Sequence, residues 1–69
     1  MYEWRIQIIL KSGKEHTVYY RGSEKTSTGV FNRMFVGEAN VFNGFANKER
    51  TKNIFVKIGE IAAVSIEAA

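Results

Sequence analysis

The sequence predicts a small α+β domain built on a strongly bent antiparallel sheet or partly open barrel, with the element order β-β-α-β-β-β. Three observations lead to this fold class: a period-two alternation near the start, a stretch with helical spacing in the middle, and two short alternating runs hinged at a glycine near the end. The chain has 69 residues and no proline, repeat or linker marks an internal boundary, so residues 1–69 are expected to form a single domain.

The first expected element is a β-hairpin. In "YEWRIQIIL" (2–10) apolar and aromatic side chains alternate with polar ones, which is typical of a half-buried strand. "KSGKE" (11–15) is expected to form the turn, because Gly13 is free to adopt a positive φ. "HTVYYRG" (16–22) then forms the return strand.

The second expected element is a helix near residues 27–37. The apolar spacing changes there to that of one helical face, formed by Val30, Phe31, Met34 and Phe35. Ser23 is a suitable N-cap for a longer helix, but the threonine, serine and glycine residues that follow it are poor helix formers. The start is therefore placed near Ser27, and Gly37 is expected to end the helix.

Three short strands complete the predicted fold. "NVFNGFA" (40–46) is expected to form a strand bulged at Gly44, followed by a polar loop over 47–53. The segment 54–66 is rich in β-branched residues and is predicted as two strands hinged at Gly59, because one strand of that length would be unusual.

Two stretches resemble the Sm-like family of small β-barrel proteins: "IQIILKSGKEHTVYYRG" (6–22) and "IFVKIGEIAAVSI" (54–66). The resemblance implies a bent sheet or barrel with a one-turn corner before the last strand. RNA-binding members of that family carry an arginine before the closing glycine, where this chain has Ile58, and an aspartate in the first motif, where this chain has none. The family's RNA contacts are therefore not transferred. The chain is also similar to small phage and prophage proteins of Gram-positive bacteria.

The composition excludes several kinds of chemistry. The chain has no cysteine, which removes disulfides, thiolate metal sites and cysteine nucleophiles. It has one histidine, His16, and no aspartate, so neither a metal site nor a cofactor is expected. The glutamates mostly neighbour basic or loop residues and are expected to be solvated, and no glycine-rich phosphate loop is present. We therefore expect a protein that is not an enzyme.

Two surfaces are candidates for binding. The first is basic, and its candidate nucleic-acid contacts are Arg5, Lys11, Lys14, Tyr19, Arg21, Lys48, Arg50, Lys52 and Lys57. The second is apolar, and its candidate subunit or partner contacts are Val41, Phe42, Phe45, Val64 and Ile66. The alternative interpretations are that the lysines keep the hairpin tips soluble and that the aromatic residues are core.

The function expected from these patterns is that of a small oligomeric binding module, such as a phage or prophage accessory protein acting on a protein or small-ligand partner. The alternative is nucleic-acid binding through the basic hairpin surface. Self-association is expected because a domain of this size buries only about 60% of its surface and small domains often compensate by oligomerising. No signal peptide or membrane span is expected, since charged residues interrupt the first residues and no apolar run approaches about 20 residues. A cytoplasmic location is therefore expected.

Overall fold

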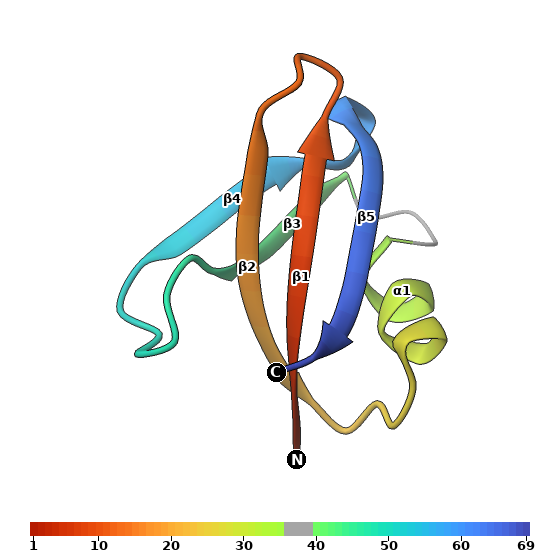
Figure 1. Cartoon of the computed structure of the whole chain (residues 1–69), viewed down its shortest axis with the longest axis vertical. Coiled ribbons are helices and arrows are strands. Elements are labelled where there is room, and N and C mark those ends of the chain that lie inside the picture. The colour runs from red at the N-terminus through yellow and green to blue at the C-terminus, as the bar shows by residue number, and fades with distance from the viewer. Residues whose placement is uncertain (36–39) are drawn as a thin grey trace.

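The computed structural model describes residues 1–35 and 40–69, which form five β-strands, one α-helix and one turn of 3₁₀-helix (Figure 1). In chain order the elements are β1 (Tyr2–Leu10), β2 (Glu15–Gly22), α1 (Ser27–Phe35), β3 (Val41–Phe45), β4 (Asn53–Lys57), η1 (Ile58–Glu60) and β5 (Ile61–Ala68). This order roughly matches the predicted one and adds η1 at the expected hinge. The predicted helix end at Gly37 lies outside the described residues.

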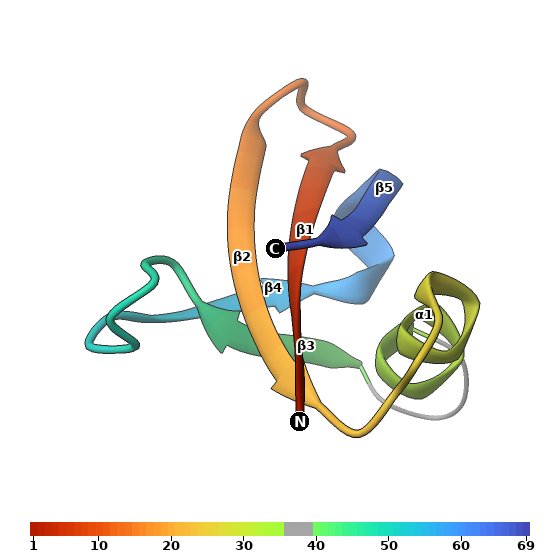
Figure 2. The same cartoon turned by 60° about the horizontal axis from the view of Figure 1, so that its bottom comes forward.

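The strands form one antiparallel sheet in the order β4-β3-β2-β1-β5, which is open because the end strands β4 and β5 are not paired with each other. β1 lies between β2 and β5 and has long ladders with both of them. By contrast, the only paired residues between β2 and β3 are Tyr19 and Phe45. We call this junction of β2 and β3 the seam. The sheet bends sharply there, so that the β3–β4 ribbon crosses behind β1 and β2 (Figure 2).

The core lies between the two parts of the bent sheet and α1. It consists of seven buried hydrophobic residues in the described chain, namely Trp4, Ile6, Ile8, Val18, Val30, Phe42 and Val56. The alternation predicted for the first strand is confirmed, and Gly13 adopts the expected positive φ of 92° in the first turn. Phe42 was expected at a partner surface, but its side chain is 1% exposed and belongs to the core.

Gly44 has a different structural role from the one expected. The β3–β4 register runs past it without a shift, so the predicted bulge is wrong. A Cβ atom at this position would lie 2.2 Å from Val18 Cγ1, and glycine therefore allows β3 to approach β2 closely. A register irregularity occurs elsewhere, in the β1–β5 ladder, where Ile9 pairs with Ala63 and Leu10 pairs with Ile61.

The helix is attached to the sheet by polar and apolar contacts. Thr26, rather than Ser23, caps its N-terminus, because Thr26 Oγ1 accepts a hydrogen bond from the Gly29 N–H at 3.0 Å. Val30 is fully buried, and Phe35 stacks on Phe42 with ring centroids 5.0 Å apart.

The loop before the helix is held by Glu24. Its backbone oxygen accepts a hydrogen bond from Trp4 Nε1 at 3.1 Å, and its carboxylate accepts one from the Tyr20 hydroxyl at 2.6 Å. The hydrogen bond from Tyr20 lowers the pKa of Glu24, whereas burial, followed by the contact with Glu24, raises the pKa of Tyr20. These contacts fix α1 beside β5, where Figure 1 shows it.

Candidate functional site

A row of side chains crosses the outer face of the sheet, opposite the core. Tyr19 on β2 pairs with Arg5 on β1 and with Phe45 on β3, and Arg5 pairs in turn with Glu67 on β5. Directly opposed residues of an antiparallel ladder place their side chains on the same face. We call these four residues the outer row.

Two ion pairs hold arginine side chains against this face. Arg5 Nε donates a hydrogen bond to Glu67 Oε1 at 2.8 Å, and Arg21 Nε donates one to Glu3 Oε1 at 3.1 Å. The hydrogen bond and charge of Arg21 lower the pKa of Glu3, and the hydrogen bond to Glu67 raises the pKa of Arg5. Exposed pairs of this kind add little stability, but they orient the two guanidinium groups.

The β3–β4 loop brings two further cations to the outer row. The loop is held by Asn47, whose Nδ2 donates to Thr51 Oγ1 at 2.7 Å and whose Oδ1 accepts from the Thr51 N–H at 3.1 Å. Arg50 has a φ of 61°, in the left-handed region that few non-glycine residues adopt. Its guanidinium lies over the Phe45 ring, 5.6 Å from the centroid. The charges of Arg50 and of Lys48 also contribute to lowering the Glu3 pKa.

These elements enclose a small hollow of about 140 Å³, lined by Glu3, Arg5, Tyr19, Lys48, Arg50 and Ala69. A shallow polar groove shares Arg5 and Tyr19 with it and continues over the sheet past Gln7, Thr17 and Ser65. We call the hollow and this extension together the outer groove. Three cations (Arg5, Lys48 and Arg50) and two carboxylates (Glu3 and Glu67) line the outer groove, and Arg21 adjoins it through its ion pair with Glu3, so the local charge is positive.

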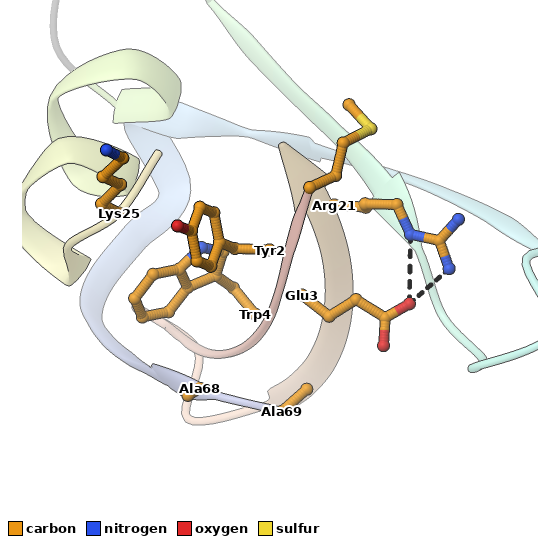
Figure 3. A pocket seen from close by; sticks show the side chains of 8 residues that line it. Tyr2, Glu3, Trp4, Arg21, Lys25, Ala68 and Ala69 are labelled. Carbon is orange, nitrogen blue, oxygen red and sulfur yellow. Dashed lines mark hydrogen bonds and ion pairs between the residues drawn. The ribbon is translucent and has the colours of Figure 1, made fainter. Parts of the chain in front are cut away.

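A second, broader hollow lies around the start of β1 and meets the outer groove at Glu3 and Ala69. Figure 3 shows the rings of Tyr2 and Trp4 on one side of β1 and the Glu3–Arg21 pair on the other side. The Trp4 indole N–H already donates to the Glu24 backbone oxygen. The charged side chains of this hollow are Glu3, Arg21 and Lys25, and it offers fewer polar side chains to a ligand than the outer groove does, so the outer groove is the stronger candidate site.

The structure brings together five of the nine predicted nucleic-acid contacts, namely Arg5, Tyr19, Arg21, Lys48 and Arg50. The other four lie elsewhere. Lys11 and Lys14 are in the β1–β2 turn, which lies at the far end of the long strands (Figure 1), whereas Lys52 precedes the edge strand β4 and Lys57 is its last residue. The carboxylate partners Glu3 and Glu67 were not anticipated, although the alternation of β1 already places Glu3 on the same face as Arg5.

The predicted apolar contacts are divided between two faces. Phe45 lies in the outer row, and Val41 is 48% exposed at the start of β3. Val64 and Ile66 are half-buried and line a shallow apolar hollow beside Phe31 of α1. Phe55 on β4 was not predicted, yet its side chain is 67% exposed.

The described residues contain no group of three or more histidine or carboxylate side chains that could hold a metal ion. His16 pairs with Ile8 at the start of β2, and Glu15 accepts a hydrogen bond from Gln7 Nε2 at 3.0 Å. Within residues 1–35 and 40–69, no helix has the length and apolar character needed to cross a membrane.

Comparisons with protein-family models, with curated proteins and with solved structures gave no match for this chain. The resemblance to Sm-like proteins and to phage proteins therefore stays a prediction.

Proposed function

We propose that the protein is a non-catalytic binding module that self-associates through the free edges of its open sheet. The observation that carries this proposal is the character of β5, which within the described residues is paired with a strand on one side alone and has no charged residue from Ile61 to Ile66. Exposed edges are normally protected by charged residues, by proline or by a covering element. An uncharged edge of this length is suited to pairing with another strand.

The backbone register supports edge pairing. The Ala69 N–H donates to the Glu3 oxygen at 3.0 Å, and hydrogen-bonded pairs alternate along an antiparallel ladder. By this alternation Val64 and Ile66 direct their backbone polar groups away from β1, toward the free edge. The same reasoning from the Ile58–Asn40 hydrogen bond of 2.9 Å places the backbone polar groups of Phe55 at the free edge of β4.

The two edges are also complementary in charge. Lys52 precedes β4 and Lys57 is its last residue, whereas Glu60 precedes β5 and Glu67 lies near its end. This favours a head-to-tail arrangement in which β4 of one copy pairs with β5 of the next, a contact that either closes into a ring or continues as a filament. The added strand would also cover the apolar surface beside Phe31, which is 39% exposed.

Placing lysines on the β5 edge is expected to abolish this association. In the double variant Ala63→Lys with Ser65→Lys, both changed residues are exposed on the outer face of β5, so the fold has room for the new side chains. Multi-angle light scattering is expected to show oligomers for the unaltered chain and the monomer mass of 7.8 kDa for the variant.

The matched control is Gln7→Lys with Thr17→Lys, which adds the same charge to the same face on the interior strands β1 and β2. This control is expected to remain oligomeric, because its new charges do not lie on an edge. An unaltered chain that is monomeric at every concentration would contradict the proposal.

Nucleic-acid binding is the second candidate function, and the convergence of four cations around Tyr19 favours it. Lysine and arginine contacts to phosphates release counterions, so the binding constant falls as salt rises, with a slope of about 0.7 per phosphate contact on a single strand. Removing contacts should therefore weaken binding and flatten the salt dependence together.

The test compares Lys48→Gln with Arg50→Asn against Lys11→Gln with Lys14→Gln. Asparagine tolerates the left-handed backbone of residue 50, so the first variant removes two charges without new strain. Fluorescence anisotropy across a salt series is expected to show a flatter slope for the first variant and an unchanged slope for the second. Absence of binding by the unaltered chain at low salt would refute this function.

A further inference from the structure

We propose that the outer groove binds a single-stranded nucleic acid in an extended form, with one base stacked on Tyr19. This inference rests on the second candidate function and specifies the form of its ligand. Three properties of the groove support it: an aromatic surface in the sheet, a hollow sized for one ring, and cations placed around that hollow.

The aromatic surface is formed by neighbouring residues on two strands. Tyr19 and Phe45 are directly paired across the β2–β3 seam, and both side chains are half-buried, so part of each remains open to solvent. Arg50 lies over Phe45 and Arg5 is the neighbour of Tyr19 on the other side. Proteins that bind single strands stack bases on aromatic and arginine side chains held in this way.

The dimensions of the site favour a chain-like ligand. The hollow of about 140 Å³ is smaller than the roughly 300–1,000 Å³ of pockets that enclose a whole small molecule. It accommodates one planar group, while the groove beyond it offers the hydrogen-bonding side chains of Gln7, Thr17 and Ser65 to the rest of the ligand. In a duplex the faces of the bases are covered by their neighbours, so only a single strand can present a base to Tyr19.

The cations around the hollow indicate that the chain-like ligand is an anionic polymer. Lys48 and Arg50 stand at one side of the hollow, and Arg5 and Arg21 lie on the sheet beside it. An acidic peptide would satisfy these charges, but it has no regular planar group for Tyr19. A phosphodiester chain with bases satisfies both features, whichever sugar it carries.

The experiment measures affinity by fluorescence anisotropy for oligothymidylate and oligouridylate of about twelve nucleotides, which is within the range bound by small domains. Tyr19→Leu is expected to weaken binding to both by about tenfold or more while leaving the salt slope unchanged, because stacking involves no counterion release. Tyr19→Phe keeps the ring and is expected to bind like the unaltered chain. Tyr2→Leu, a tyrosine that is 49% exposed outside the groove, is the matched control.

A second measurement does not depend on the stability of these variants. Oligonucleotides carrying 5-bromouracil are irradiated on the unaltered chain, and the cross-linked residue is located by mass spectrometry. The expected cross-links are at Tyr19 or Phe45, and cross-links confined to the broader hollow around Tyr2 would overturn the proposal.

The other outcomes distinguish nucleic-acid binding itself from the stacking of a single strand on Tyr19. If Tyr19→Leu binds as well as the unaltered chain while the Lys48 and Arg50 variant flattens the salt slope, the protein binds nucleic acid but not by stacking on Tyr19. Equal affinity for a duplex of the same length would overturn the single-strand form in the same way. Competition by polyglutamate as effective as that by the oligonucleotide would identify an acidic-peptide site. No binding of the oligonucleotides at low salt would refute both nucleic-acid binding and stacking on Tyr19.

Discussion

Replacing Ile6 by alanine is expected to remove half or more of the stability of this domain. Ile6 is fully buried at the centre of β1, where it pairs with Val18 on one side and with Ile66 on the other. Truncating a buried isoleucine to alanine costs about 2–5 kcal/mol, whereas the free energy of unfolding is about 0.05–0.15 kcal/mol per residue, or roughly 3–10 kcal/mol for a chain of this length. Urea denaturation followed by circular dichroism measures the loss.

Ile9→Ala provides the matched control on the same strand. Ile9 is 36% exposed on the outer face, so the same truncation there leaves no closed cavity. Its cost is expected to be below about 1 kcal/mol. Equal losses for the two variants would show that the inner and outer faces of β1 are wrongly assigned.

Gly44→Ala is expected to have the second large effect, through overpacking rather than a cavity. The new Cβ would lie 2.2 Å from Val18 Cγ1 and 3.1 Å from Phe42 Cε1, and both of these side chains are buried in the core. β3 would have to move away from β2, which strains the single Tyr19–Phe45 pair at the seam. We expect a loss of about 1–3 kcal/mol in the free energy of unfolding.

A double-mutant cycle with Val18→Ala tests this cause. Val18→Ala removes the atom in the way, so the double variant is expected to be more stable than the sum of the two single losses predicts. Gly59→Ala is the control, because a Cβ there meets no atom within 4 Å and the smaller backbone freedom of alanine is neutral or stabilising. Additive losses in the cycle would exclude a clash with Val18.

The strands of the first hairpin and the hinge near Gly59 could be predicted because the signals for them are local. Alternation along β1 records directly which side chains face the core, and Gly13 fixes the turn that sets the β1–β2 register. The pairing of Arg5 with Tyr19 then follows from counting along the hairpin. This part of the outer row was therefore accessible from the sequence.

The aromatic residues of β3 show where local reasoning fails. Phe42 and Phe45 were both interpreted as candidate partner contacts because they belong to one apolar stretch around Gly44. Without a bulge, residues three positions apart on a strand lie on opposite faces, so Phe42 is core and Phe45 is in the outer row. The reason for the glycine is a contact with another strand, which sequence spacing does not record.

The grouping of the cations failed for a related reason. Lys48 and Arg50 reach the outer row only because the β3–β4 ribbon bends at the seam and its loop returns past Glu3. Lys11 and Lys14 are closer to Arg5 in the sequence but are carried to the far end by the length of β1. The bend of the sheet at the β2–β3 seam therefore determines which of these cations lie together on the folded surface.

The position of β1 between β2 and β5 also determines how the chain must fold. Its ladder with β2 closes a short turn, but its ladder with β5 joins residues as distant as Arg5 and Glu67, which are 62 positions apart. The entropy of closing such a loop has to be overcome before the distant ladder contributes any stability, and high contact order slows folding. Until β5 docks, β1 itself is an open edge beside the exposed side chains of Ile6 and Ile8. The folding chain therefore exposes a different edge from the two that the native sheet presents.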